Sequence, residues 1–372
     1  MRAVGIDPGT KSMDICGIEN DRVYFERSIE TEEVLNNPKI MVDELKDAKP
    51  FDTLAAPSGY GVEPTNLSEV NEKNLEDWYY QYILLTEKKY VERAIEEELT
   101  GALLYKAMAE SIKEIKREDW NTWFIPGVIN LPTVPKYRKV NKIDMGTADK
   151  LAVTALSLYK ESREKKFDEC SYVLLEMGFG YNSVLAIDEG RLIDGVGGTT
   201  ISGPGFLTIS SIDAEFVQLV GQWDKGDVFK GGAATISRTD SPDQLLDCIE
   251  EKKECKIAYE AMIEGVIKAV NSLKSEISED KVYVSGRLSE KSRIIEDLKE
   301  KLDDIRKLDS IKGAEKTKKT AQGYGIVAGG LTGGHFSDLI EHMKIPEASG
   351  TSLDYLYHPK AQKIEDKLVS FK

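Results

Sequence analysis

The chain has few of the residues that build a disulfide framework or a histidine metal site. It contains 4 cysteines and 3 histidines among 372 residues. The cysteines lack the short paired spacing of a zinc site, and we expect them to be free thiols in a reducing cytoplasm: Cys16, Cys170, Cys248 and Cys255. The histidines all lie in the last tenth of the chain, so the sequence does not predict a histidine metal site or a catalytic histidine.

Positive charge and long apolar runs are also scarce. Lys and Arg total 50 against 65 Asp and Glu, which gives a formal net charge of −15. This balance argues against a surface that coats nucleic acid, because phosphate contacts need clustered cations. No run approaches the roughly 18 apolar residues of a membrane span. We therefore expect a cytoplasmic protein with neither a nucleic-acid nor a membrane partner, and we interpret the lysines of residues 312–319 as a solvated face.

An internal repeat is the most informative feature that is present. The segment that starts at Ala3 aligns without gaps with the segment that starts at Tyr172. Asp7 then matches Glu176, an offset of 176 − 7 = 169 residues, and Gly9 matches Gly178 at the same offset. Each copy reads as an apolar strand, an acidic residue, a glycine turn and a second strand, which is typical of a β-hairpin. Other strand–glycine–strand units share part of this pattern, but a carboxylate at both strand ends favours a functional site in each half.

The rest of the chain alternates helical and strand patterns in both halves, which predicts an α/β fold. We expect a first domain over residues 1–143 that contains a helical insertion at about 63–118. A second domain is expected over residues 144–335, and a tail over residues 336–372 that packs on the first domain.

Five motifs in a fixed order identify a resemblance. They are the turns at residues 6–12 (IDPGTKS), 175–181 (LEMGFGY) and 284–287 (VSGR), and two helices rich in small residues at 145–156 and 321–330. They resemble the two phosphate motifs, the adenosine motif and the connecting helices of the superfamily of acetate and sugar kinases, heat-shock chaperone ATPases and actin (ASKHA). Within it, residues 190–194 and 203–206 are similar to a segment of the archaeal family of predicted butyrate kinases.

The resemblance implies two related ribonuclease H-like, actin-like ATPase domains with a nucleotide cleft between them. It implies a kinase that uses ATP and Mg²⁺ to phosphorylate a short-chain carboxylate such as butyrate, and that forms a homodimer. Asp7 and Glu176 would hold Mg²⁺ through water. Glycines let backbone N–H groups approach phosphate, and Arg287 would stack on adenine. The implied nucleotide-binding residues are Gly9, Thr10, Lys11, Ser12, Gly178, Phe179, Gly180, Tyr181, Ser285, Gly286 and Arg287.

The catalytic residues are carried over less directly. Acetate kinases stabilise the transferred group with Arg and His, whereas residues 136–142 contain cations and no His. Arg138, Lys142 or Lys150 would have to replace them, and Lys11 or Arg138 would neutralise charge on the transferred group. Residues 145–150 also resemble the Gly-x-Asp-Arg motif of type III pantothenate kinases, which would make Asp149 a base and Lys150 a substrate contact. The alternative is that Asp149 only interacts with a helix N-terminus.

Two further departures keep other functions open. Glu176 stands where most of the superfamily has Asp, and Ser285-Gly286 replaces the commoner Gly-Gly. One alternative is a metabolite kinase of the same fold that phosphorylates a hydroxyl group, because such an acceptor gains from a base. The other is a nucleotide-binding ATPase or regulatory switch that phosphorylates no metabolite, because one fold hosts both kinds of function.

Overall fold

The computed structural model describes residues 1–96 and 100–371, which form two compact units. Unit 1 contains residues 1–143, 147–167 and the chain from residue 309 onward. Unit 2 contains residues 144–146 and 168–308. Each unit is an α/β structure built on its own sheet.

Unit 1 has a mixed sheet in the order β3-β2-β1-β4-β6-β5, in which β1 runs antiparallel to β2 and parallel to β4. Its strands are β1 (Arg2–Pro8), β2 (Ser12–Glu19), β3 (Arg22–Glu30), β4 (Thr53–Ala55), β5 (Thr65–Asn66) and β6 (Thr122–Phe124). Its helices are α1 (Thr31–Asn36), α2 (Ile40–Asp47), α3 (Leu75–Trp78), α4 (Lys88–Glu96), α5 (Thr100–Arg117), α6 (Lys136–Lys139), α7 (Ala148–Glu161), α13 (Lys319–Leu331), α14 (Ser337–His342) and α15 (Gln362–Glu365).

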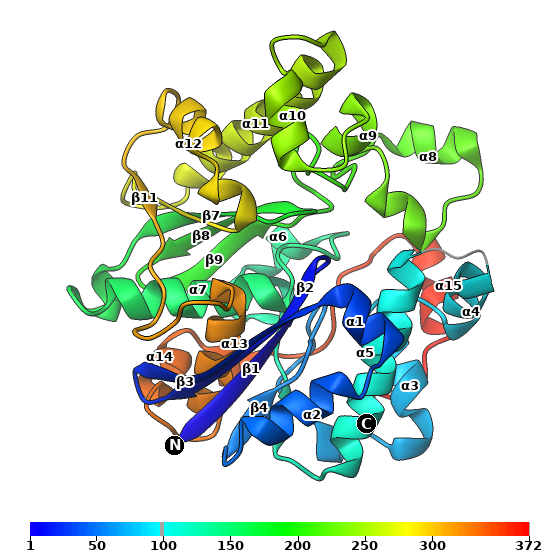
Figure 1. Cartoon of the computed structure of the whole chain (residues 1–372), viewed down its shortest axis with the longest axis vertical. Coiled ribbons are helices and arrows are strands. Elements are labelled where there is room, and N and C mark those ends of the chain that lie inside the picture. The colour runs from blue at the N-terminus through cyan, green and yellow to red at the C-terminus, as the bar shows by residue number, and fades with distance from the viewer. Residues whose placement is uncertain (97–99, 372) are drawn as a thin grey trace. The chain divides into compact units, whose positions relative to one another are not determined.

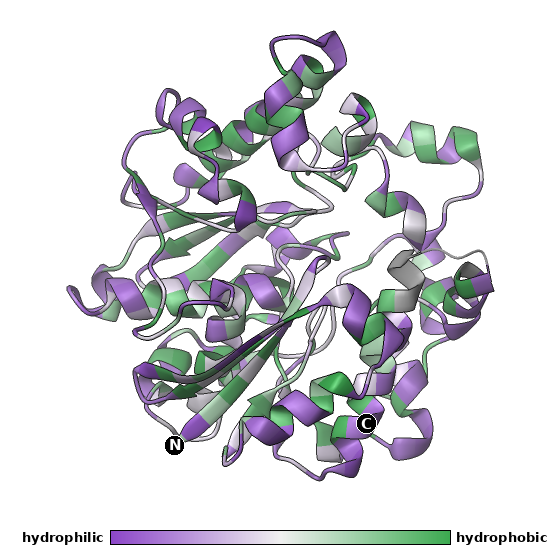
Figure 2. Cartoon of the chain, in the orientation of Figure 1, coloured by the Kyte–Doolittle hydropathy of each residue, from purple (hydrophilic) through white to green (hydrophobic). Residues whose placement is uncertain are grey.

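Strand β1 is apolar along most of its length (Figure 2). Both of its faces are buried, as is typical of strands that read as continuous apolar runs. Val4 and Ile6 belong to a core cluster that also contains residues of α2 and α5. The other face meets α13, which packs against β1, β2 and β4 and against α7. A side chain on Gly323 would put its Cβ only 1.9 Å from the Ala152 carbonyl oxygen. Gly323 is therefore what lets α13 cross α7 closely at Ala152.

Unit 2 has a sheet in the order β11-β10-β7-β8-β9, which repeats the topology of the unit 1 sheet without a counterpart of β5. Its strands are β7 (Tyr172–Met177), β8 (Asn182–Asp188), β9 (Arg191–Val196), β10 (Val282–Ser285) and β11 (Ile305–Lys307), and its helices are α8 (Ala214–Val220), α9 (Ala233–Ser237), α10 (Pro242–Cys248), α11 (Lys253–Lys274) and α12 (Ser292–Lys299). The long helix α11 packs against β7, β8 and β9 (Figure 1). Val173, Leu175 and Met177 of β7 belong to the core cluster beside it.

The two sheets confirm the predicted α/β fold with two related halves. In each sheet, the first three strands along the chain pair antiparallel in succession. A later strand then pairs parallel to the first of these three, on its other side. The register of the second hairpin shifts between Gly17 and Ile18 in unit 1 and between Ala186 and Ile187 in unit 2. These positions are 186 − 17 = 169 residues apart, so the irregularity follows the sequence repeat.

The compact units differ from the predicted domain boundaries. A division does fall after Ile143, but α7 and α13 group with unit 1, although both lie within the range predicted for the second domain. Packing explains the grouping, because α13 covers β1 and crosses α7. The tail also belongs to unit 1, where the Trp78 indole N–H donates to the Phe371 carbonyl at 2.9 Å and the Asn130 amide donates to the Gly350 carbonyl at 3.0 Å.

The predicted helical insertion is only partly helical. Helices α4 and α5 fill its second half, whereas residues 63–87 contain the short strand β5, helix α3 and single turns of 3₁₀ and π helix. Residues 97–99 of that range, and Lys372, lie outside the described residues. No helix among the described residues is long and apolar enough to cross a membrane.

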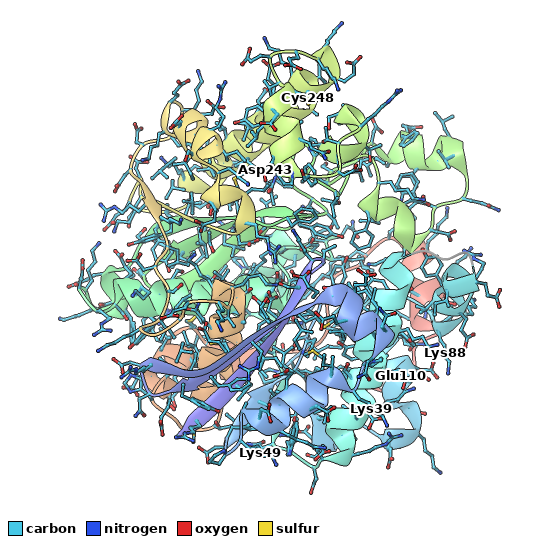
Figure 3. The ribbon with its side chains drawn as sticks, viewed as in Figure 1. Lys39, Lys49, Lys88, Glu110, Asp243 and Cys248 are labelled. Carbon is cyan, nitrogen blue, oxygen red and sulfur yellow. A yellow bond between two sulfur atoms is a disulfide. The ribbon has the colours of Figure 1, made fainter. Side chains whose placement is uncertain are left out.

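The prediction of four free thiols is wrong for two cysteines. Cys248, at the end of α10, forms a disulfide with Cys255 near the start of α11 (Figure 3). Cys16 and Cys170 are buried and are not part of a disulfide. The sequence did not show the pair because the two cysteines are seven positions apart, and only the turn between α10 and α11 brings them together.

Candidate functional site

The two predicted phosphate turns are closed by the same backbone hydrogen bond. The Gly9 N–H donates to the Ser12 carbonyl at 3.0 Å, and the Gly178 N–H donates to the Tyr181 carbonyl at 2.8 Å. These hydrogen bonds occupy matching positions of the repeat. Each closes a four-residue turn between two antiparallel strands and presents the residues at its tip.

In unit 1, Asp7 lies at the end of β1 with an exposure of 5%. Its Oδ2 atom accepts a hydrogen bond from the Thr320 hydroxyl at 2.7 Å and lies 2.5 Å from the Lys318 ammonium. Both partners come from the start of α13 and the residue before it. The predicted metal-binding carboxylate is thus already balanced by a cation of its own unit.

Lys318 contacts the first turn although no motif in the sequence points to it. Its backbone N–H donates to Asp14 Oδ2 at 2.7 Å, and its ammonium also donates to the Ser12 carbonyl at 3.1 Å. It does not belong to a solvated face, which corrects the interpretation of that lysine cluster. The sequence shows only that these lysines precede a helix rich in small residues. No local pattern distinguishes Lys318 from the neighbouring lysines as a contact of the turn.

A second ion pair of unit 1 lies at the start of α7. The Lys150 ammonium is 2.6 Å from Asp149 Oδ2, and the Thr147 hydroxyl donates to Asp149 Oδ1. Burial alone would raise the pKa of Asp149, but the charge of Lys150 and the hydrogen bonds from Lys150 and Thr147 hold that pKa below its usual value, and the charge of Lys318 adds to the lowering. Asp149 is in the first turn of α7, so its ion pair supplements the expected interaction with the helix N-terminus.

The remaining predicted residues of unit 1 differ in exposure. Thr10 and Lys11 are exposed at the tip of the turn, whereas Ser12 is buried and its hydroxyl donates to Asp14 at 2.8 Å. Arg138 lies on α6, with its guanidinium over the ring of Tyr137. The described contacts thus gather Asp7, Ser12, Lys318 and Thr320 around the turn, and Asp149 with Lys150 at the start of α7.

In unit 2, the second phosphate motif meets the adenosine motif. Glu176 is 5% exposed and pairs with Ser285 across the parallel strands β7 and β10. Gly286 has a φ of +93°, and a Cβ there would lie 2.2 Å from the Met177 carbonyl and 2.7 Å from Glu176 Oε1. Only glycine fits this backbone next to the carboxylate. The structure therefore brings Glu176, Ser285 and Gly286 together, and Arg287 follows at the start of a 3₁₀ turn.

The tip of the second turn is packed on both sides. The Phe179 ring lies 5.4 Å from the Phe206 ring, and Tyr181 lies edge-on to Phe229 at 5.6 Å. The Gly180 carbonyl accepts hydrogen bonds from the N–H groups of Leu207 and Thr208. Phe206, Leu207 and Thr208 therefore hold the second phosphate turn in place, and of these only Phe206 belongs to the predicted motif at residues 203–206.

Two polar residues of β8 were also missed. Ser183 pairs directly with Glu176 in the β7–β8 register, and Asn182 pairs with Met177. Both side chains are buried, and the amide atoms of Asn182 and the hydroxyl of Ser183 have no hydrogen-bond partner among the described residues. The repeat gave a usable signal, because the same offset matches Ser183 with Asp14.

A buried carboxylate supports a neighbouring loop of unit 2. Asp144 Oδ2 accepts hydrogen bonds from the backbone N–H and the hydroxyl of Thr199, both at 3.0 Å. Its backbone carbonyl accepts one from the Thr200 hydroxyl at 3.0 Å. A Cβ on Gly197 would lie 1.8 Å from Asp144 Oδ1, so this glycine-rich loop needs its glycine to pack on Asp144.

Comparison with known proteins places the chain in a family. The family described as protein of unknown function DUF1464 matches residues 5–358. The chain belongs to this family. No curated protein matches it.

Solved structures show which fold the family has. A propionate kinase from Francisella tularensis subsp. tularensis SCHU S4 is similar with a TM-score of 0.56 at 12% identity, over 87% of this chain and 98% of that one. Acetate kinase from Entamoeba histolytica gives 0.55 at 13% identity, over 81% and 86%. Acetate kinase from Porphyromonas gingivalis gives 0.52 at 12%, over 80% and 86%. The chain thus shares the two-unit α/β fold of these kinases, which is the fold that the resemblance in its sequence predicts.

Proposed function

We propose that this chain is a Mg²⁺–ATP-dependent small-molecule kinase whose acceptor is a short-chain carboxylate such as butyrate. The observation that carries the proposal is the repeated glycine turn, closed by the same hydrogen bond in both units and preceded in each by a buried strand-end carboxylate. The similarity in fold to acetate and propionate kinases supports it.

The residues of unit 1 fit a triphosphate and a magnesium ion. Asp7, Thr320 and Ser12 supply oxygen atoms only, which is the donor type that Mg²⁺ prefers. A Cβ at Gly9 would lie 2.3 Å from Lys318 Nζ and 2.7 Å from the Ser12 carbonyl oxygen, so the turn needs glycine to pack against these two groups. The described residues contain no group of three or more His, Cys, Asp or Glu side chains that could hold a metal. Mg²⁺ usually binds one or two carboxylates and takes its other ligands from water and substrate phosphates.

Four residues of unit 1 then have defined tasks. Backbone N–H groups of the turn and the Thr10 hydroxyl bind phosphate oxygens, and Asp7 binds the metal, which when present neutralises charge on the transferred group. Lys11 and Lys150 provide fixed positive charge near that group, and positioning with electrostatics supplies most of the catalysis. In unit 2 we assign nucleotide binding to residues 178–181 and 285–287.

The state of Asp149 favours a carboxylate acceptor. An effective general base has a pKa near the working pH and an oxygen that can reach the proton. Both carboxylate oxygens of Asp149 are already engaged, one by the Lys150 ammonium and one by the Thr147 hydroxyl, and these contacts hold the pKa of Asp149 below its usual value. A carboxylate acceptor is already ionised and needs no base. We therefore assign Asp149 to holding Lys150 in position rather than to removing a proton.

A coupled assay tests this function. Purified protein with ATP and Mg²⁺ is screened against short fatty acids, and turnover should fall at least about tenfold in Glu176→Gln. Equal turnover in wild type and Glu176→Gln contradicts the proposal. ATP binding by calorimetry without turnover on any metabolite favours the regulatory switch instead. The homodimer stays a prediction that light scattering can check.

Asp149→Asn distinguishes the two kinds of acceptor. A carboxylate acceptor predicts a small loss of turnover, whereas removal of a base that a hydroxyl acceptor needs costs about 10²- to 10⁴-fold. Asp168→Asn is the matched control, because it makes the same change at an exposed aspartate that lies seven residues after the end of α7. A loss of that size in Asp149→Asn alone would favour the hydroxyl-directed kinase.

A further inference from the structure

The ammonium of Lys318 lies directly against the first phosphate turn. It is 2.5 Å from Asp7 Oδ2 and 3.1 Å from the Ser12 carbonyl oxygen. A Cβ built on Gly9 would lie 2.3 Å from Lys318 Nζ. The side chain is 25% exposed, so an anion that approaches the turn from solvent can reach this ammonium.

The backbone that carries Lys318 is fixed by groups other than its ammonium. The N–H groups of residues 315–317 donate to the Glu26 carboxylate, as does the Thr317 hydroxyl. The Lys318 N–H donates to Asp14 Oδ2 at 2.7 Å. Four consecutive N–H groups therefore attach this segment to β2 and β3. The side chain can exchange one anionic partner for another without any movement of the main chain.

The buried carboxylate of Asp7 explains why a lysine is needed beside the turn. Asp7 is almost completely buried, and an unpaired buried carboxylate is costly. A triphosphate brought to the turn would add repulsion to that cost unless a cation lies between the two. Thr320 also donates to Asp7 at 2.7 Å, so the carboxylate keeps one hydrogen bond if the ammonium turns away.

We propose that Lys318 is a phosphate-binding residue whose ammonium pairs with Asp7 and turns to the triphosphate when one binds, leaving Asp7 to a divalent metal. The proposal rests on the proposed function, because it assumes that the turn takes a triphosphate. Lys318 and the metal then compete for the same carboxylate. This competition predicts effects of opposite sign for the two partners of the ion pair.

Calorimetry with sodium tripolyphosphate, with and without Mg²⁺, measures these effects directly. In EDTA, Lys318→Gln should bind tripolyphosphate about tenfold more weakly, the usual effect of losing one charge-assisted hydrogen bond. Asp7→Asn should bind it more tightly in EDTA, because the ammonium is released and a negative charge is gone, but should gain less from Mg²⁺ than wild type does. A purely structural ion pair would instead weaken binding in both variants.

Two controls separate position from charge and folding. Lys316→Gln removes the same charge from an exposed side chain two residues away and should bind like wild type, while Lys318→Arg should stay within about threefold. The pair Asp7→Asn/Lys318→Gln leaves no unpaired buried charge. It should bind tripolyphosphate in EDTA more weakly than Asp7→Asn alone, even if Lys318→Gln does not fold.

The outcomes separate this inference from the function on which it rests. If tripolyphosphate binds to wild type but Lys318→Gln equals Lys316→Gln, only the role of Lys318 is overturned. If Asp7→Asn binds no more tightly than wild type in EDTA, the competition is overturned. If wild type binds neither tripolyphosphate nor ATP, the inference and the proposed function both fail.

Discussion

The two hairpins of the repeat have matching backbone pairing and different electrostatics. Both turns are closed by a hydrogen bond at the same repeat position, and both second hairpins shift register at the same place. Asp7, however, lies against the ammonium of Lys318, whereas Glu176 lies against the backbone of Gly286. The repeat thus determines where a strand-end carboxylate lies. Segments outside the repeat determine its partners, and these segments make the two halves different.

The largest expected change in the free energy of unfolding comes from a substitution in β1, where helix α13 packs on it. Gly5 of β1 matches Leu174 of β7, and 174 − 5 = 169. A Cβ on Gly5 would lie 2.3 Å from the Ala321 carbonyl and 2.4 Å from the Gly325 nitrogen, both of them backbone atoms of α13. Gly5→Ala should therefore lower the free energy of unfolding by about 3 kcal/mol, measured by urea denaturation.

Gly180→Ala is the matched control for that substitution. Its Cβ would meet nothing closer than the Leu207 side chain at 3.5 Å, which is ordinary contact, so the expected change in the free energy of unfolding is within about 1 kcal/mol. If the two alanine variants are equally stable, the close approach of α13 to β1 is not what requires glycine at position 5.

The same contrast shows what the sequence could predict. The hairpins, their offset and the helices with small residues are local patterns, and the structure confirms them. The disulfide between Cys248 and Cys255 and the pairing of Lys318 with Asp7 are not local. Lys318 is 318 − 7 = 311 residues from its partner, and only the docking of α13 on β1 decides which lysine of the cluster reaches the turn. The grouping of α7 with unit 1 depends on the same packing.

The disulfide between Cys248 and Cys255 is a second difference between the two units, because both cysteines lie in unit 2. Joining residues seven positions apart removes conformational freedom from the unfolded chain, and a loop of that length contributes about 2–3 kcal/mol. Reduction should lower the free energy of unfolding of wild type by that amount. The variant Cys248→Ser/Cys255→Ser should not respond to the reductant. A wild type that mass spectrometry shows to be reduced, with unchanged stability, would contradict this prediction.

Unit 1 should show a pH dependence that unit 2 lacks at the matching position. Burial by itself raises the pKa of Glu26, but the hydrogen bonds from residues 315–317 outweigh it and lower that pKa in the folded state. Its stabilisation is therefore fully present above the unfolded pKa, near 4.3, and is lost as the pH falls through the lowered folded pKa. The repeat position in unit 2 is Gly195, since 195 − 26 = 169.

Glu26→Gln tests this anchor. At pH 7 it should cost about 1 kcal/mol, a value reduced for the partial exposure of the carboxylate, and the difference from wild type should shrink as the pH falls below about 4. Glu30→Gln, on the same strand but exposed, should cost less than about 0.5 kcal/mol at either pH. In a Trp223→Phe background, tryptophan fluorescence reports unit 1 alone. A cost that does not change with pH would mean that the carboxylate charge is not what anchors residues 315–317.

The smallest expected effect distinguishes two buried asparagines. Asn182 matches Met13 of unit 1, and no described group satisfies its amide. Asn182→Leu should therefore leave the free energy of unfolding unchanged or raise it by up to about 1 kcal/mol, because an unsatisfied buried amide is replaced by an apolar group of similar shape.

Asn130 provides the opposite case in unit 1. Its amide is equally buried, but it accepts a hydrogen bond from the Gly127 N–H and donates one to the Gly350 carbonyl, both at 3.0 Å. Asn130→Leu should cost about 2 kcal/mol, because two backbone groups lose their partners. If Asn182→Leu costs as much in urea denaturation, then the amide of Asn182 binds something, and the second phosphate turn beside it would be the first place to search for that ligand.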